Sequence, residues 1–496
     1  MEKIDIKVYK VNEAYVKIDC EPSTSAELSE YFSFMVPGYQ FTPAFRNKLW
    51  NGKIYLYNKQ TRQIYYGLLS HLQAFAEERN YKIIFDDKVL QTTSFSLHEA
   101  KEYAESLQIQ SRNKDIEARD YQIEAFAHCV RNRRQMLISP TASGKSLIAY
   151  LITRHMTDQG KKGLIIVPTT SLVEQLYTDF QDYSTKNGWS VEDNIHRIYS
   201  GREKSSDKLV TISTWQSLYT LPKNYFNYEW VIGDEAHNFK AKSLTTIMTN
   251  LDKASLRIGM TGTLDGTKTH KLVLEGLFGP VRKTITTKEL IDKKQLSDFE
   301  IKCLVLKYPE EISRLLKDAK YIDEMKYIVT SDARNKFIRN LVLSLEGNTL
   351  ILFQYVDNHG KGLHKLIEEK AEGRKVFFVH GGTETETREE IRAIVEKENN
   401  AIIVASYGTF STGINVRNLH NIIFASPSKS RIRNLQSIGR GLRLGDNKKK
   451  AVLFDIADDL RYKKHENFTL KHFRDRVRIY NEERFEYKLY NIELKV

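Results

Sequence analysis

The sequence predicts an α/β protein in which two tandem parallel-sheet lobes follow a small α+β domain. The chain has 496 residues, too many for one hydrophobic core and suited to about three domains. From about residue 114 onward, short apolar runs alternate with helical segments, as in parallel sheets that are buried on both faces. The first 113 residues instead combine alternating strands with a helix. We therefore expect domains at 1–113, 114–285 and 286–496.

Charge and composition indicate what kind of partner the protein binds and in which cellular compartment it works. The formal net charge is +13, and a surplus of this size favours a polyanionic partner, most commonly nucleic acid. The alternative interpretation is that the positive net charge only keeps the protein soluble. Cys20, Cys129 and Cys303 match no zinc or disulfide spacing, which is typical of a reducing compartment. No apolar run reaches the roughly 20 residues that cross a bilayer, and the amino terminus lacks the apolar core of a signal peptide. We expect a soluble intracellular protein.

The first domain carries a basic, aromatic segment. Residues 47–57, NKLWNGKIYLY, are predicted to form a β-hairpin with its turn at Asn51 and Gly52. Cations interleaved with aromatic rings are typical of surfaces that bind nucleic acid. Alternating aromatics on a hairpin are also typical of a core face, so both interpretations stand. The candidate nucleic-acid contacts are Arg46, just before this segment, and Lys48 and Trp50 within it.

The lobe expected at 114–285 begins with a phosphate-binding loop. Residues 139–146, SPTASGKS, follow a predicted strand and precede a predicted helix, which is the context that such a loop requires. The segment matches G-x-x-x-x-G-K-[ST] except that Ser139 replaces the first glycine, and a small serine can begin the same turn. Lys145 would neutralise the β- and γ-phosphates, and the hydroxyl of Ser146 would bind Mg²⁺. An ordinary turn with a stray lysine is the alternative. The candidate nucleotide ligands are Thr141, Ala142, Ser143, Gly144, Lys145 and Ser146.

Two adjacent carboxylates follow a later apolar strand of the same lobe. Asp234 and Glu235 end the run VIGDE, and α/β sheets bind ligands at the carboxyl ends of their strands. Asp234 can hold Mg²⁺ through its waters, and Glu235 can orient and deprotonate an attacking water. Two acids in a loop are often only solvated surface. Their place behind a buried strand and downstream of a phosphate loop favours the catalytic interpretation.

The lobe expected at 286–496 contains the motif Q-x-x-G-R-x-x-R and ends in a basic helical tail. Gln436, Arg440 and Arg443 belong to this motif, and its two guanidiniums lie on one helical face. They could reach across a cleft to a γ-phosphate, a contact worth about 10³–10⁵ in rate. A basic surface turn is the alternative. The tail can pack on this lobe or contact duplex DNA, and the sequence does not choose between the two.

In this order, Lys145 and residues 234–237 and 436–443 resemble the motifs of superfamily 2 helicases. Together with FTPAFRNKLWNGKIYLY, IVPTTSLVEQ and VASYGTFSTGI they resemble, over nearly the whole chain, the UvsW-type recombination helicases of bacteriophages. The resemblance implies two RecA-like lobes and a DNA-dependent ATP hydrolase that remodels forks, Holliday junctions and R-loops in recombination, repair and replication. It also implies ATP and Mg²⁺ as cofactors, DNA or RNA–DNA hybrids as partners, a monomer, and a location in the host cytoplasm.

The resemblance assigns roles to further residues. Gln122 would recognise adenine with Arg119 and Tyr121 beside it, and Gly413 would also contact the nucleotide. The residues that would couple the nucleotide to lobe movement are His237, Thr261, Gly262 and Thr263. The residues that would hold nucleic-acid phosphates are Pro168, Thr169, Thr170, Thr214, Trp215, Gln216, Phe353, Gln354, His380, Gly381, Ser406, Thr409 and Thr412. Such contacts position a strand without reading its sequence, so we expect sequence-independent binding.

Three other functions remain open. An RNA helicase is the nearest alternative, since residues 234–237 spell DEAH, which also labels an RNA-remodelling group. A nucleic-acid-binding scaffold with an inactive ATPase is a second alternative, although Lys145, Glu235 and Arg440 argue against it. A packaging motor is conceivable from the phosphate loop alone, but the motif at 436–443 is not expected there.

Overall fold

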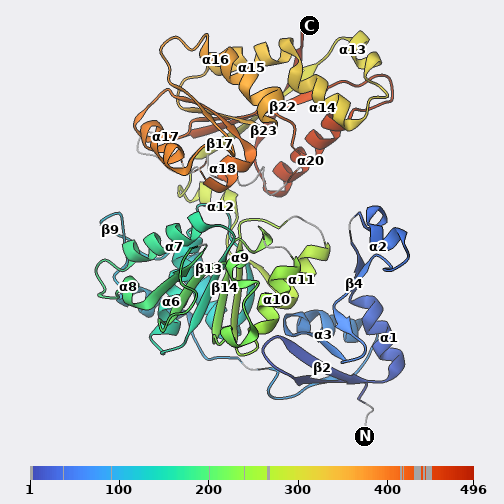
Figure 1. Ribbon diagram of the computed structural model, residues 1–496, viewed down its shortest axis with the longest axis vertical. Coiled ribbons are helices and arrows are strands. Elements are labelled where there is room, and N and C mark those ends of the chain that lie inside the picture. The colour runs from blue at the N-terminus through green and yellow to red at the C-terminus, as the bar shows by residue number, and fades with distance from the viewer. Residues whose placement is uncertain are drawn as a thin grey trace. The chain divides into compact units, whose positions relative to one another are not determined.

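The computed structural model divides the chain into two compact units, shown in Figure 1. One comprises Met1–Ser139 and Gly144–Thr284, and the other comprises Pro140–Ser143 and Ile285–Val496. The first contains the amino-terminal α+β domain and a parallel-sheet lobe, and the second contains another parallel-sheet lobe, as predicted. The residues that the structure describes are 4–36, 38–90, 92–199, 201–238, 241–264, 268–413, 416, 418–428, 430, 437–439, 442 and 450–495.

The amino-terminal domain is built on a five-stranded sheet in the order β5-β6-β2-β1-β7. The alternation that predicts its strands is visible in β1, where Ile6 and Val8 are buried and Lys7 is exposed. β1 pairs antiparallel with β2 and parallel with β7. The elements are β1 (Ile6–Lys10), β2 (Tyr15–Cys20), α1 (Pro22–Tyr31), β5 (Tyr57–Asn58), β6 (Gln63–Tyr65), η2 (Tyr66–Leu68), α3 (Leu69–Glu78) and β7 (Ile83–Phe85).

The predicted hairpin at 47–57 is wrong. β4 (Lys53–Tyr55) pairs antiparallel with β3 (Ser33–Met35), and the segment between them contains η1 (Tyr39–Phe41) and α2 (Pro43–Arg46). The helix forms because Thr42 caps it, accepting a hydrogen bond from the N–H of Phe45, and because Pro43 stands at its first position. Gly52 is a turn residue, with φ of 79°, but the turn does not join two paired strands.

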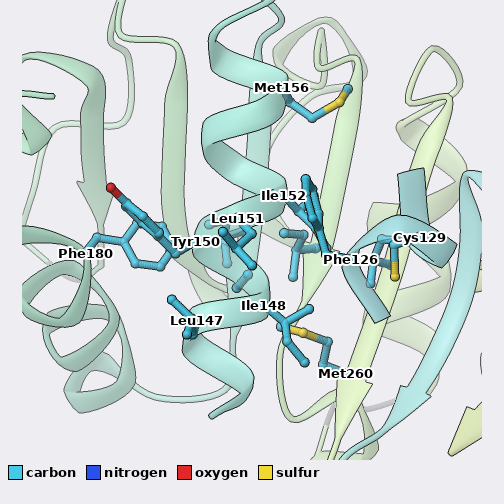
Figure 2. Close-up of a cluster of buried hydrophobic side chains, with 14 of the residues drawn as sticks. Phe126, Cys129, Leu147, Ile148, Tyr150, Leu151, Ile152, Met156, Phe180 and Met260 are labelled. Carbon is cyan, nitrogen blue, oxygen red and sulfur yellow. The ribbon is translucent and has the colours of Figure 1, made fainter. Parts of the chain in front are cut away.

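The first lobe is a seven-stranded sheet in the order β12-β13-β11-β14-β15-β10-β16, with every adjacent pair parallel. Helix α6 packs its apolar side chains against this sheet; Figure 2 shows Ile152 near Phe126 and Ile148 near Met260. The strands are β10 (Arg134–Ile138), β11 (Gly163–Val167), β12 (Ile195–Ile198), β13 (Val210–Thr214), β14 (Trp230–Gly233), β15 (Leu256–Thr261) and β16 (Val281–Lys283). The helices are α5 (Asp120–Asn132), α6 (Lys145–Thr157), α7 (Thr170–Tyr183), α8 (Val191–Asn194), α9 (Trp215–Leu218), η3 (Lys223–Tyr225), η4 (Ala236–Asn238), α10 (Ala241–Asn250) and α11 (Lys268–Phe278). Between the amino-terminal domain and α5 lie α4 (Leu97–Ser106), β8 (Gln110–Ser111) and β9 (Lys114–Asp115).

The amino-terminal domain is docked on the first lobe through close backbone and polar contacts. A Cβ added to Gly67 would lie 2.0 Å from the carbonyl oxygen of Glu275 in α11, so only glycine fits between the two segments. The Glu275 carboxylate also accepts from His71 at 2.9 Å. The guanidinium of Arg134, in β10, lies 3.9 Å from the ring centroid of Tyr66. These contacts join the domain to β10 and α11.

The second lobe is another seven-stranded parallel sheet, in the order β19-β20-β18-β21-β22-β17-β23. Its strands are β17 (Asp298–Lys307), β18 (Thr349–Phe353), β19 (Val376–Val379), β20 (Ile402–Ser406), β21 (Asn421–Phe424), β22 (Lys450–Asp459) and β23 (Tyr487–Glu493). Its helices are α12 (Thr287–Asp292), α13 (Glu310–Leu315), α14 (Tyr321–Thr330), α15 (Asp332–Ser344), η5 (Val356–Gly360), α16 (Lys361–Glu368), α17 (Thr385–Lys397), α18 (Tyr407–Gly413) and α20 (Phe468–Glu482).

The basic carboxyl-terminal tail is part of the second lobe. Strand β23 pairs with β17, and α20 packs on β22. The buried guanidinium of Arg476 forms an ion pair with Asp455 at 2.8 Å, and the same carboxylate accepts from the hydroxyl of Tyr480 at 2.8 Å. The tail therefore packs on the second lobe, one of the two possibilities that the sequence left open. Within the described part of the chain, no helix is long and apolar enough to span a membrane.

Candidate active site

The serine that replaces the first glycine of the phosphate loop anchors the loop. Ser139 is fully buried, and its N–H donates to the carbonyl of Thr261, in β15, at 2.9 Å. Its hydroxyl accepts from the hydroxyl of Thr284, just after β16, at 2.9 Å. The loop is thus held to both strands that flank β10. The departure from the glycine pattern supplies a hydrogen bond that glycine could not make.

The loop residues before α6 have the backbone geometry of an anion-binding turn. Ala142 and Gly144 both adopt left-handed conformations, with φ of 67° and 78°. Left-handed residues in such turns direct successive N–H groups into a concavity that favours anions. Ser143 is buried and donates its hydroxyl to the carbonyl of Pro140 at 2.6 Å, while Thr141 is half-buried. These loop residues and the start of α6 provide the backbone donors that a phosphate requires.

The residues predicted to bind adenine lie against this loop. A Cβ at position 144 would lie 2.3 Å from Nε2 of Gln122, so Gly144 is required by its neighbour as well as by its own φ. The amide oxygen of Gln122 accepts from the N–H of Arg119 at 2.8 Å. The guanidinium of Arg119 donates to the hydroxyl of Tyr121 at 2.9 Å. The structure therefore brings Arg119, Tyr121 and Gln122 together at the start of α5.

Lys145 and Glu235 form an ion pair across the site. The distance from Nζ of Lys145 to Oε1 of Glu235 is 3.1 Å, and both side chains are largely shielded from solvent. Nζ also donates to the carbonyl of Ser139 at 3.4 Å. Glu235 has a left-handed backbone with φ of 49°, which is unfavourable for a residue with a side chain and is found preferentially at functional sites. The cation and the carboxylate that are predicted to act in catalysis therefore lie in contact.

Asp234 presents a buried carboxylate oxygen with no hydrogen-bond partner in the described part of the chain. Burial, with the charge of Glu235 adding to it, raises the pKa of Asp234 to about 7, while Lys145 acts in the opposite direction. Among the described residues no group donates to its shielded Oδ1. An unsatisfied carboxylate oxygen near the phosphate loop is a suitable ligand for a hard cation such as Mg²⁺.

The hydroxyl of Ser146, the second predicted metal ligand, is hydrogen-bonded to Tyr183. The two oxygens are 2.9 Å apart, and Tyr183 is buried at the end of α7. Burial raises the pKa of the Tyr183 hydroxyl, so it stays protonated near neutral pH. A hydroxyl of this kind can orient the Ser146 hydroxyl toward a metal. Sequence reasoning missed Tyr183, because no motif marks a residue so far along the chain.

Three of the predicted coupling residues form one hydrogen-bonded chain. Nδ1 of His237 lies 2.5 Å from the hydroxyl of Thr261 and 3.5 Å from the Glu235 carboxylate. The Thr261 hydroxyl donates to the carbonyl of Thr263 at 2.8 Å. Gly262 lies between the two threonines, after β15. A displacement of Glu235 would therefore change the contacts of His237 and, through them, the position of the Thr261 hydroxyl at the end of β15.

The predicted nucleic-acid residues of the first lobe lie at the carboxyl ends of adjacent strands. Thr169 caps α7 after β11, with Pro168 and Thr170 on either side of it. The segment formed by Thr214, Trp215 and Gln216 follows β13, and the amide of Gln216 donates to the carbonyl of Pro168 at 3.2 Å. This bond joins the two segments, in which Pro168 and Thr214 are buried while Thr170 and Gln216 are exposed.

The predicted nucleic-acid residues of the second lobe differ in accessibility. Phe353 is fully buried and its ring stacks on Phe378 with centroids 5.5 Å apart, so its side chain cannot contact a strand. The N–H of Gln354 donates to the hydroxyl of Ser426 at 3.1 Å. The turn after β19 is closed by the N–H of Gly382, which donates to His380 at 3.0 Å, and Gly381 between them is exposed.

The predicted motif after β20 is described in part. The hydroxyls of Ser406 and Thr409 are 2.8 Å apart at the start of α18. The backbones of Thr412 and Gly413 end α18, and their side-chain environments lie outside the description. Gln436, Arg440 and Arg443 also lie outside the described residues.

The basic segment of the amino-terminal domain divides into exposed and internal residues. Arg46 and Lys48 are exposed. Trp50 is half-buried, and its indole N–H donates to the carbonyl of Lys53 at 2.8 Å. This bond gives Trp50 a structural role, and its contact with nucleic acid stays a prediction.

A phosphate loop and a carboxylate pair on one parallel-sheet lobe, with a second such lobe after it, define the two-lobed helicase class. Three family models match the chain: "DNA helicase UvsW, N-terminal" at residues 5–86, "Type III restriction enzyme, res subunit" at 115–266 and "Helicase conserved C-terminal domain" at 333–445. The ATP-dependent DNA helicase uvsW of Enterobacteria phage T4 is 36% identical over 99% of this chain and 100% of its own length. The chain belongs to the UvsW family of helicases, as the sequence predicted.

Comparisons with solved structures agree on the fold. The crystal structure of T4 UvsW covers 99% of this chain and is itself covered completely, with a TM-score of 0.54 and 35% identity. The restriction-modification enzyme LlaBIII matches 84% of this chain, with 34% of its own length covered, a TM-score of 0.56 and 16% identity, and supports the fold alone. The expectation of two RecA-like lobes after an α+β domain is confirmed. Family membership makes the chain an enzyme, an ATP-dependent helicase.

Proposed function

We propose that this helicase acts on DNA, uses ATP with Mg²⁺, and remodels branched molecules such as forks, Holliday junctions and R-loops. The observation that carries the proposal is the cluster in the first lobe, in which Lys145 contacts Glu235 and Asp234 keeps an unsatisfied oxygen nearby. The T4 relative, named an ATP-dependent DNA helicase, supports DNA as the substrate. We further propose that residues 1–113 bind DNA, and that 114–285 and 286–496 are the two motor lobes.

The residues of the first lobe would divide the chemistry among them. Backbone N–H groups at 141–146 would bind the phosphates, and Lys145 would leave Glu235 to neutralise them. Ser146 and Asp234 would hold Mg²⁺, which shields phosphate charge when bound. Glu235, released from Lys145, would orient the attacking water and accept its proton.

The second lobe would complete the site and make hydrolysis depend on lobe closure. Arg440 and Arg443 would stabilise the charge that develops on the γ-phosphate, with Gln436 beside them. Because the groups come from two lobes, ATP would favour a closed state and hydrolysis would release it. The chain from Glu235 through His237 to Thr261 gives this change a route into the lobe.

Branched DNA is a suitable substrate because branch migration forms about as much duplex as it melts. Each step exchanges roughly 1.4 kcal/mol of stacking for a similar amount, so ATP supplies direction more than melting energy. The surplus of 13 positive charges fits a polyanionic partner. If six to ten phosphates are neutralised, affinity should fall about 10³–10⁵-fold between 50 and 200 mM salt. A nearly flat salt dependence would contradict the proposal.

The decisive experiment compares ATP turnover with forked DNA, linear duplex DNA, single-stranded DNA and single-stranded RNA. We expect the highest stimulation with forked DNA and little with RNA. Lys145→Ala should abolish turnover, while Lys186→Ala, which removes an exposed lysine paired with Asp115, should keep it. Preference for RNA would support the RNA-helicase alternative. Equal turnover in the wild type and Lys145→Ala would refute the assigned site.

A further inference from the structure

A small folded tip, residues 38–52, stands at the end of the β3–β4 ribbon, away from α1 and α3 (Figure 1). Tyr39 and Phe45 meet edge to face with ring centroids 4.7 Å apart. The Tyr39 ring also covers Gly52, where a Cβ would come within 2.5 Å of it. Trp50 closes the base of the tip by donating its indole N–H to a backbone carbonyl of β4. These contacts make the tip a preformed structure with an aromatic core of its own.

Two large apolar side chains of the tip are left in solvent. Leu49 is 81% exposed, more than any other large hydrophobic residue among those described, and Phe41 is 70% exposed. Single exposed hydrophobic residues are ordinary, but two on one preformed tip mark a surface that something else covers. The tip itself has already used its other aromatic residues in its core. Leu49 and Phe41 are therefore available to an external partner.

The charge around these side chains indicates the chemistry of that partner. Residues 31–76 contain no Asp or Glu and five basic residues. Lys53 is paired with Glu30 on α1, but Arg46 and Lys48 are exposed on the tip itself. An apolar tip flanked by cations complements a partner that presents an apolar face beside negative charge. DNA offers this combination only where a base pair lacks a stacked neighbour, since the bases of a continuous duplex cover one another.

We propose that the tip is a wedge for the branch point of DNA, where Phe41 and Leu49 stack against the exposed base pair. Arg46 and Lys48 hold the phosphates on either side of the branch. This inference rests on the proposed branched-DNA function and specifies which part of the substrate the amino-terminal domain recognises. It also gives a reason for the packed aromatic core of the tip, since a wedge must keep its shape against a stack of bases.

The wedge is tested by measuring how the protein binds two DNAs in the absence of ATP. One is a fork with 2-aminopurine at the branch and its arm ends closed by hairpin loops. The other is a linear duplex closed in the same way, so that no base-pair face is free. We expect the wild type to raise 2-aminopurine fluorescence at the branch, but not when the probe lies well inside an arm. Phe41→Ala and Leu49→Ala should lose this signal and bind the fork about tenfold more weakly, the usual effect of removing a stacking side chain, with affinity for the closed duplex unchanged.

Two control variants distinguish the effect of stacking from the effect of charge and from the effect of removing any exposed apolar side chain. Leu315→Ala, at a residue 76% exposed on α13 of the second lobe, should keep wild-type fork affinity and signal. Arg46→Ala should weaken binding to the fork and reduce its salt slope by about one, while the fully bound fork keeps its 2-aminopurine signal. Melting temperatures equal to that of the wild type check that the alanine variants are folded.

The outcomes distinguish the wedge from the function on which it rests. If the wild type prefers the fork and the alanine variants at Phe41 and Leu49 keep both affinity and signal, the wedge is wrong while the helicase proposal stands. If the wild type binds the fork no better than the closed duplex, the branched-DNA function fails and the wedge fails with it. If these variants lose only a concentration-dependent dimer in sedimentation, the tip is a self-association surface and the wedge is overturned.

Discussion

The pH dependence of Mg²⁺–nucleotide binding tests the electrostatics at Asp234. Burial, followed by the charge of Glu235, raises the pKa of this carboxyl to about 7. A metal binds the carboxylate, so below this pKa a proton must leave first. A group with a pKa of about 7 is about 90% ionised at pH 8 and about 10% ionised at pH 6. The Mg²⁺-dependent part of the affinity should therefore fall about tenfold between pH 8 and pH 6.

The assay follows a fluorescent ADP analogue with Mg²⁺ and with a chelator across this pH range. Each value is corrected for the affinity of Mg²⁺ for ADP in free solution at the same pH. Glu235→Gln removes a charge that raises the pKa of Asp234, so the midpoint should move to lower pH. A flat Mg²⁺-dependent affinity, or a midpoint that stays in place in Glu235→Gln, would refute the raised pKa.

The same carboxyl should lower the stability of the nucleotide-free protein at high pH. Below about pH 4 the carboxyl of Asp234 is neutral in both the folded and the unfolded chain. Between about pH 4 and pH 7 only the unfolded chain loses the proton, so stability declines across this window and levels off above it. Asp234→Asn removes this cost of about 2–4 kcal/mol. Its melting temperature should exceed that of the wild type at pH 8, by a margin that shrinks toward pH 4.

Three further substitutions test other contacts. Tyr183→Phe removes the hydroxyl bonded to Ser146, so Mg²⁺-dependent ADP affinity should fall severalfold while affinity in chelator stays constant; Tyr177→Phe on the same helix is the matched control. Equal Mg²⁺ dependence in both variants would exclude a positioning role. Gly67→Ala drives a Cβ into a backbone carbonyl of α11, so the free energy of unfolding should fall by about 1–3 kcal/mol. Thermal unfolding measures this loss, and an unchanged melting temperature would contradict the docking contact. Arg257→Met removes the hydrogen bonds of the buried guanidinium to the carbonyls of Met248, Leu251 and Ala254, and should lower the free energy of unfolding by about 3 kcal/mol; a wild-type urea midpoint would show that water replaces the guanidinium.

The parts of the fold and site that could be predicted are those with local signals. The parallel sheets follow from short apolar runs, because strands buried on both faces need apolar residues throughout. Lys145 and Asp234 could be found because their chemistry requires fixed positions after a strand. The role of Ser139 could not be predicted, because its partner Thr284 is 145 positions away and no pattern connects them.

The wrong hairpin shows how a pairing signal fails when a capping signal competes with it. Asn51 and Gly52 favour a turn, but Thr42 and Pro43 begin a helix upstream, and this removes the strand that the hairpin needed. β4 then pairs with β3 across the tip. The tail was undecided for a related reason. The basic helix contains Arg476, and the charge of an arginine suggests that its side chain faces solvent or DNA. In the structure Arg476 instead forms a buried ion pair with Asp455 on β22.

The contact between Lys145 and Glu235 suggests why nucleotide binding and activation of the base would occur together. Lys145 and Glu235 neutralise each other, so a phosphate that takes Lys145 necessarily releases Glu235. The released carboxylate keeps its contact with His237, which lies 3.5 Å away and is bonded to Thr261. On the proposed mechanism, the same ion pair would hold the catalytic base until a phosphate binds and would be the first link between the nucleotide and the end of β15.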